Sequence, residues 1–311
     1  MFIDVFRRID QVVHRPVLRN ILGGVFILGS LSYLGYVLFN NWGELTRYDW
    51  RIDCVWVVLA FLFYSVALFT VVIGWSWIMK RISFSAHETR LPKHLKYYIY
   101  SNLCQRLPAP ALYLLGRAYL YESEGVTKTV TVAISILEWL ILTFSGVIVY
   151  LVLSPFSSLP SPGYNNYWIL AGVIILSSLL IHPRIIQLIL RFRGQEEIAP
   201  PFNYVDVWIS LFIYSLVWIL GGLTLYTVIN SIYPLSLGSL SAVISVWALS
   251  GSLTTVILIA IPGFGIKEVT LSFLLGYLMP SPLAIVVSLL MRVCLTVFEI
   301  FWGIVAVILK E

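Results

Sequence analysis

The stretch Ala260-Ile261-Pro262-Gly263-Phe264-Gly265-Ile266-Lys267-Glu268 interrupts a long apolar region with a proline, two glycines and two adjacent charges. Apolar runs flank it on both sides, over 253–260 and 269–277. In lipid each unsatisfied backbone amide is costly, so a broken helix is stable there only inside protein or against a water-filled cavity. Charged side chains at that depth are also costly and by default indicate a functional site. The stretch therefore predicts a polar site inside a membrane.

The composition of the whole chain agrees with this interpretation. Hydrophobic residues make up 59% of the 311 residues and charged residues 11%, against about 25% charged in an ordinary soluble domain. Several apolar runs reach the roughly 20 residues that a helix needs to cross the hydrocarbon core. No stretch outside these runs is long enough for a soluble catalytic domain. We therefore expect an all-α polytopic membrane protein in which residues 1–311 form a single transmembrane domain.

Six apolar runs predict full spans, at 21–39, 54–79, 129–153, 167–182, 206–229 and 283–309. Basic residues cluster in the N-terminal tail and in the loops 80–96 and 183–203, whereas the loops 154–166 and 230–238 carry no charge. By the positive-inside rule the basic segments face the cytoplasm. We therefore expect a multi-pass protein of the cell membrane with both termini in the cytoplasm. The net charge of +5 reflects this topology and does not indicate a nucleic-acid partner.

The segment 97–125 does not fit as a simple span. Its two apolar arms, 97–105 and 111–121, flank Arg106-Leu107-Pro108-Ala109-Pro110. Each arm is about ten residues, or roughly 15 Å of helix, which covers half a bilayer. The prolines remove backbone donors and disfavour helix at the residue before each. A re-entrant helical hairpin fits this pattern, and an amphipathic helix at the membrane interface is the alternative.

The segment 239–279 is the second broken region. Its first arm, 239–261, is long enough to cross, whereas its second arm, 268–279, is too short to cross unaided. The order span, broken hairpin, span therefore occurs twice, at 54–153 and at 206–309, entering from opposite faces. This order is typical of an inverted-topology repeat, in which broken helices meet near the midplane and build a transport site.

Ten residues are candidates for that site. Arg106, Arg117, Lys267 and Arg292 are expected to line a cavity for an anionic group such as phosphate, because guanidinium groups bind its oxygens at two points. Glu138, Glu268 and Glu299 would hold these cations or contact a cationic head group. The backbone amides near Pro262, Gly263 and Gly265 begin a half helix and are natural anion donors.

Each candidate also has a structural interpretation. Arg106 and Arg117 could extend to the interface, Lys267 and Glu268 could form a water-exposed pair, and Glu138 and Arg292 could belong to structural ion pairs. We find no metal-binding or catalytic motif, so no cofactor is expected and the chain is not predicted to be an enzyme.

Two motifs resemble a known family. Residues 261–268 resemble the Pro-Gly-Gly-x-Gly-x-Arg-Glu signature of the lysylphosphatidylglycerol synthase transmembrane (flippase-like) family, with Lys267 in place of the arginine. Residues 102–126, with Leu107-Pro108, Gly116-Arg117-Ala118 and Glu124-Gly125-Val126, resemble its looser earlier motif. Glu138 and Arg292 fall where that family tends to place an intramembrane acid and an arginine.

The resemblance implies a lipid flippase that moves anionic or aminoacylated phospholipids, or polyprenyl-phosphate sugars, between leaflets. Because no nucleotide-binding motif is found, we expect movement to be passive or driven by an ion gradient, with Glu138 or Glu268 as a proton carrier. The resemblance also implies a homodimer. Lipid aminoacylation is not expected, because the chain has no soluble transferase domain. Two other functions stay open: a membrane-embedded lipid-modifying enzyme with Glu138 or Glu268 as general base, and a non-transporting partner that recruits a cytoplasmic synthase or glycosyltransferase.

Overall fold

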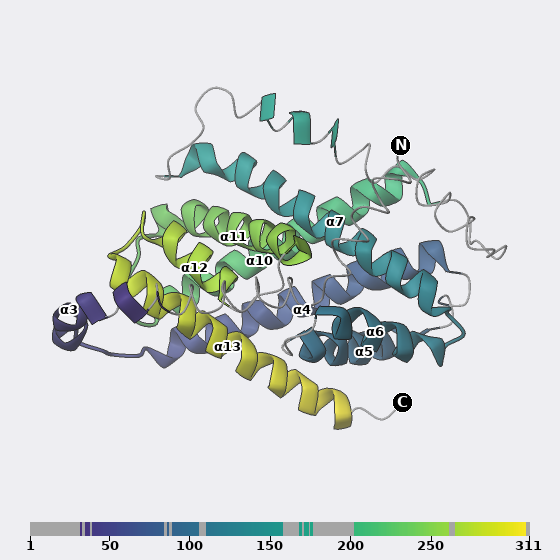
Figure 1. The fold of residues 1–311 in the computed structure, drawn as a ribbon, viewed down its shortest axis with the longest axis horizontal. Helices are drawn as coiled ribbons and strands as arrows, with labels where there is room; N and C mark the ends of the chain where they lie inside the picture. Colours follow the sequence, from purple (N-terminus) through teal and green to yellow (C-terminus); the bar gives the residue numbers. More distant parts are fainter. Residues whose placement is uncertain are drawn as a thin grey trace.

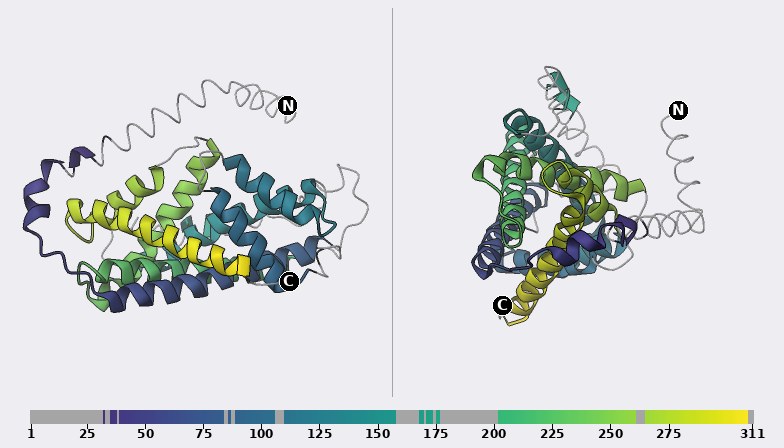
Figure 2. Two further views of the ribbon diagram at one scale, coloured as in Figure 1. Left: turned by 90° about the horizontal axis from the view of Figure 1, so that it is seen from below. Right: turned by 90° about the vertical axis from the view of Figure 1, so that its left-hand side faces the viewer.

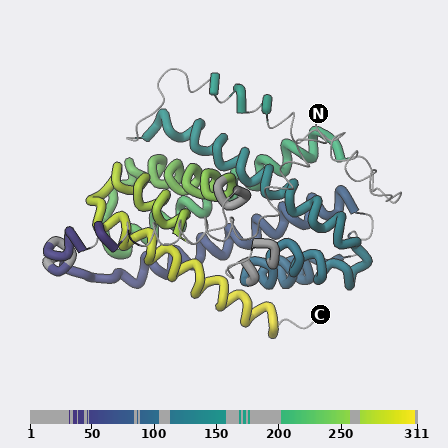
Figure 3. Tube along the Cα trace, in the orientation of Figure 1, coloured from purple at the N-terminus to yellow at the C-terminus, as the bar shows by residue number. Residues whose placement is uncertain are grey.

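A computed structural model describes residues 39–83, 86, 89–105, 110–157, 202–260 and 265–308, with isolated positions between 32 and 37 and between 168 and 176. The elements assigned within these ranges are all helical, as Figure 1 and the tube in Figure 3 show. They are α3 (Trp42–Arg47), α4 (Cys54–Ile82), α5 (Leu91–Gln105), α6 (Pro110–Glu122), α7 (Lys128–Leu153), η2 (Ser154–Phe156), α10 (Tyr204–Asn230), η4 (Leu237–Ser239), α11 (Leu240–Ala260), α12 (Ile266–Leu275) and α13 (Ser281–Ile308).

Five helices in the described part of the chain are long and apolar enough to cross a membrane: Cys54–Ile82, Lys128–Phe156, Tyr204–Asn230, Leu237–Val256 and Ser281–Ile308. The predicted all-helical membrane class is therefore confirmed. Four of the five coincide with predicted spans, and the fifth is the long first arm of the segment 239–279. The predicted spans 21–39 and 167–182 lie largely outside the described residues.

The antiparallel helices α4 and α10 make the most extensive contact between any two helices of the described residues. At one end the backbone amide of Asp53 donates to the carbonyl of Ser231 at 3.0 Å. At the other end Arg81 pairs with Asp206 at 3.0 Å. Asp206 also accepts from the backbone amide of Asn203 at 3.0 Å, so its carboxylate caps the start of α10. Both ends of the pair are thus fixed.

The remaining helices pack on this pair or on one another. α7 packs on α10 and α11, and α13 packs on α5 and, less extensively, on α4 and α10. Figure 1 and the left view of Figure 2 place α5 and α6 near one end of the long axis and α11 and α12 near the other. Buried apolar residues form one cluster where α4, α5, α7 and α10 meet and another where α10, α11, α12 and α13 meet.

The short helices match the predicted breaks. α5 and α6 have 15 and 13 residues, about 22 and 20 Å at 1.5 Å per residue, and α12 has 10. α12 begins after Gly265, whose φ of 97° is left-handed and favours glycine. The Pro-containing connections 106–109 and 261–264 lie outside the described residues.

We expect Gly222→Ala to destabilise the protein by about 1–3 kcal/mol, because α10 and α11 approach closely there and cannot accept another carbon without shifting. A Cβ on Gly222 would lie 2.6 Å from Cα of Ile244, a backbone atom. Thermal unfolding in detergent measures the effect. Gly43→Ala is the matched control, because a Cβ at that position meets nothing within 4 Å. Equal stability of the two variants would contradict the close approach.

Candidate functional site

The first site candidate is an ion pair between α6 and α7. A guanidinium nitrogen of Arg117 lies 2.5 Å from a carboxylate oxygen of Glu138, and both side chains are 0% exposed. The Nε of Arg117 also donates to the hydroxyl of Ser101 on α5 at 3.1 Å. We call Arg117 and Glu138 the first pair.

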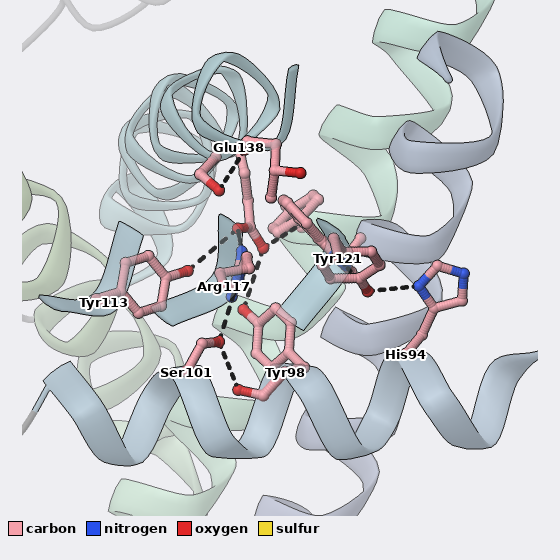
Figure 4. Close-up of polar contacts among 11 residues, drawn as sticks. His94, Tyr98, Ser101, Tyr113, Arg117, Tyr121 and Glu138 are labelled. Atoms are coloured by element: carbon pink, nitrogen blue, oxygen red, sulfur yellow. Dashed lines mark hydrogen bonds and ion pairs between the residues drawn. The ribbon is translucent and has the colours of Figure 1, made fainter. Parts of the chain in front are cut away.

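Three tyrosines surround the carboxylate of Glu138, as Figure 4 shows for Tyr98 and Tyr113. Tyr98 of α5 donates at 3.1 Å, Tyr113 of α6 at 3.3 Å and Tyr214 of α10 at 2.8 Å. With Arg117 this makes four hydrogen-bond donors to the two carboxylate oxygens. Because the donors come from three helices and the acceptor from a fourth, the first pair joins α5, α6, α7 and α10.

Aromatic rings enclose the guanidinium of Arg117. Its Cζ lies 4.0 Å from the ring centroid of Trp75 and 4.4 Å from those of Tyr98 and Tyr113. Stacking of this kind attracts a cation to the ring faces. In this structure protein side chains enclose the first pair, and its arrangement is that of the structural ion pair considered for Glu138.

The second site candidate is an ion pair between α12 and α13. Glu268, next to the N-terminus of α12, pairs with Arg292 in the middle of α13. The side chains are 8% and 25% exposed, so this pair is more open than the first. The ammonium of Lys267 lies 4.2 Å from the ring centroid of Trp247 on α11. We call Glu268 and Arg292 the second pair.

A small cavity borders the second pair. It has a volume of about 30 Å³ and is lined by Trp247, Lys267, Glu268, Leu271, Ser288, Met291, Arg292 and Leu295. This volume holds one or two water molecules. The cavity brings together three of the predicted site residues, with two positive charges and one negative charge.

The other predicted residues are placed as follows. Arg106, Pro262 and Gly263 lie outside the described residues. Gly265 caps the start of α12. Glu299 lies half-buried on α13, two turns beyond Arg292. The structure thus brings Arg117 to Glu138 and Glu268 to Arg292, and it separates these two groups into different halves of the bundle.

Sequence reasoning missed the aromatic residues of both groups. Tyr113 and Arg117 are four residues apart, which places them on one face of a helix, so this contact had a signal in the sequence. Tyr214 and Trp247 reach the charged groups across helix interfaces, and no spacing in the sequence indicates those contacts.

A buried histidine lies beside the first pair. Nδ1 of His94, near the start of α5, is 2.6 Å from the hydroxyl of Tyr121, which accepts from the indole of Trp75 at 2.7 Å. His94 is fully buried, and its Nε2 has no hydrogen-bond partner among the described residues. Burial, with a smaller effect from Lys80 and an opposing one from Glu124, lowers the pKa of His94 to about 4.

We expect acid to destabilise the protein through His94. Because its pKa is about 4 when folded and 6.5 when unfolded, its contribution to stability is complete above pH 6.5 and is lost as the pH falls towards 4. At pH 5 the loss is about 2 kcal/mol. Unfolding temperatures between pH 7 and pH 4.5 measure this, with His94→Gln as the comparison. An unchanged pH dependence in His94→Gln would contradict the prediction.

Comparisons of the chain with protein-family models, with curated proteins and with solved structures find no match. The function therefore has to be argued from the residues and their arrangement.

Proposed function

We propose that this protein is a lipid translocase that moves a lipid with a phosphate-bearing head group between the leaflets of the cell membrane. The second pair beside Lys267 is the observation that carries the proposal. Intramembrane charges are expensive and rare unless they serve a function. Two cations and one carboxylate at a cavity between helices form a group that can exchange an internal partner for an external anion.

The packing of the helices supports the inverted repeat on which the proposal depends. If α4 to α7 are matched with α10 to α13 in order, the principal contacts occur in matching pairs. The contact between α7 and α11 corresponds to the contact between α13 and α5. The contact between α7 and α10 corresponds to the smaller contact between α13 and α4. α4 and α10 contact each other and run antiparallel, as a two-fold axis in the membrane plane requires. The two hairpins would then be α5 with α6 and α11 with α12.

The charged end of the bundle supports the proposed orientation. One end of the bundle holds the end of α4, the starts of α5, α7 and α10, and the short α6–α7 turn. Its basic residues include Arg81, Lys93 and Lys128. The opposite end includes two uncharged turns, where Ser241 donates to the carbonyl of Phe156, and the segment before α4, in which Arg51 is paired with Asp49. By the positive-inside rule the first end would face the cytoplasm, and α13 would end there.

Phosphate chemistry suits the second pair. Arg292 offers a planar set of donors that matches phosphate oxygens, and Lys267 adds a second positive charge. The first backbone amides of α12 point out of the helix N-terminus beside them and add partial positive charge. The cavity is small, about 30 Å³, and in this proposal it widens to admit the head group.

Head-group accessibility in proteoliposomes tests the proposal. Vesicles would carry one labelled lipid each, from three classes: an anionic phospholipid, an aminoacyl-phosphatidylglycerol and a polyprenyl-phosphate sugar. We expect protein-dependent exposure of inner-leaflet label for at least one class, and little for a neutral diacylglycerol control. No protein-dependent exposure of any class would overturn the proposed function.

The resemblance of residues 261–268 to a known family narrows the classes of lipid to be tested. The family that residues 261–268 resemble suggests aminoacylated or anionic phospholipids as the first classes to test. Glu268 would then either bind the cationic part of such a head group or pair again with Arg292 after the lipid leaves. A homodimer and a cytoplasmic synthase as partner are further proposals from the same resemblance.

A further inference from the structure

The two ion pairs occupy matching places with opposite signs. Each joins the short second arm of a hairpin to the long helix that follows it, across 21 residues for Arg117–Glu138 and 24 for Glu268–Arg292. The short arm carries the cation in the first case and the anion in the second. A buried serine precedes each on the long helix, Ser135 on α7 and Ser288 on α13.

The first pair is built to stay closed. Both side chains are fully buried, three tyrosine hydroxyls hold the carboxylate, and three rings surround the guanidinium. Tyr121 also ties α6 to α4 through Trp75 and to α5 through His94. Separating buried charges leaves each without a partner in a dry interior, which is strongly unfavourable. Buried contacts therefore hold the hairpin of α5 and α6 to α4, α7 and α10.

The second pair is built differently. It borders the cavity, and its arginine is a quarter exposed. Water next to a pair weakens the attraction and solvates the separated charges, so the pair breaks at lower cost than a dry one. The ten residues of α12 lie between Gly265, which is left-handed, and Gly276. Glycines at the ends of a short element permit the backbone changes that a hinge requires.

We infer that the two hairpins have different roles: α12 is the moving element that opens the cavity when the second pair breaks, and the hairpin of α5 and α6 is a fixed frame. Transport would thus depend on motion of α12 rather than on equal motion of both hairpins. This inference rests on the proposed function for the identity of the site, but its geometry can be measured without any lipid substrate.

Modification of introduced cysteines tests the inference. In a background with Cys54, Cys104 and Cys294 replaced by alanine, Ser288→Cys reports on the cavity, and Ser135→Cys reports on the buried serine about one turn before Glu138. The probe is a small cationic methanethiosulfonate, and the rate is measured in detergent. We expect Ser288→Cys to react faster than Ser135→Cys, and Glu268→Gln to raise the Ser288→Cys rate about tenfold, as the loss of about 1.4 kcal/mol from the closed state would.

The matched control is Ser135→Cys in the same Glu268→Gln background, where we expect an unchanged rate. If Glu268→Gln raises the modification rate at both positions, the whole protein has become less tightly packed and the inference is wrong. It is also wrong if the rate rises at neither position. If Glu268→Gln does not yield folded protein, Arg292→Lys keeps the charge and should raise the Ser288→Cys rate to a smaller extent. If the protein translocates lipid but the two cysteines are modified at equal rates, only the inference of a fixed frame is wrong. If the protein does not translocate lipid but Glu268→Gln raises the modification rate of Ser288→Cys alone, only the proposed function is wrong.

Discussion

Glu138→Ala should lower the free energy of unfolding by about 3–5 kcal/mol, the cost of leaving a buried charge without its partner. Arg117 would remain fully buried among three rings, and Tyr98, Tyr113 and Tyr214 would lose their common acceptor. Thermal or denaturant unfolding of the purified protein in detergent measures the loss. Because the group joins four helices, we also expect the unfolding transition to broaden.

Two controls separate the charge from the packing. Glu122→Gln removes one partner of the Lys128–Glu122 pair, which is about half exposed, and should change stability by no more than about 1 kcal/mol. The double variant Arg117→Met with Glu138→Gln removes both charges while an amide oxygen still accepts from the tyrosines. It should be more stable than Glu138→Ala. If it is no more stable, the unpaired charge is not the cause of the loss.

The structure agrees with the sequence where local chemistry decides the outcome. Long apolar runs gave helices because every backbone amide in lipid needs an internal partner, and four predicted spans match helices closely. The prolines predict a break between two short helices, and α6 begins at Pro110, while residues 106–109 lie outside the described residues. Gly265, a candidate from its place after Pro262, is left-handed at the start of α12.

The arrangement of charges was less accessible from the sequence. Arg117 was expected to line an anion cavity, and it lies instead in a closed pair with Glu138. Which acid meets which base depends on how α6 and α12 pack on the helices that follow them, and periodicity does not contain that information. The contact of Tyr214 with Glu138 spans 76 residues, so it follows from the α7–α10 interface alone. Lys267 over Trp247 is another contact of this kind.

Arg292→Gln and Glu268→Gln should each lower the rate of lipid translocation in proteoliposomes by about 10- to 100-fold, for two different reasons. Arg292→Gln removes the guanidinium that would hold the phosphate, and a hydrogen bond to a charged group contributes about 1.5–3 kcal/mol. Glu268→Gln removes the carboxylate that would draw Arg292 back from the head group, so the lipid stays bound and the cycle stops. Arg292→Lys keeps the charge without the planar donors and should lose less activity.

The controls for this prediction address folding and position. Lys128→Gln changes a half-exposed pair far from the cavity, and its translocation rate should equal that of the unmodified protein. Because the second pair is partly hydrated, Glu268→Gln should lose less stability than Glu138→Ala, so a comparison of their unfolding temperatures separates an effect on transport from an effect on folding. Full translocation in both Arg292→Gln and Glu268→Gln would mean that the head group does not pass the second pair. Lipid that co-purifies more strongly with Glu268→Gln than with Arg292→Gln would support the two separate roles.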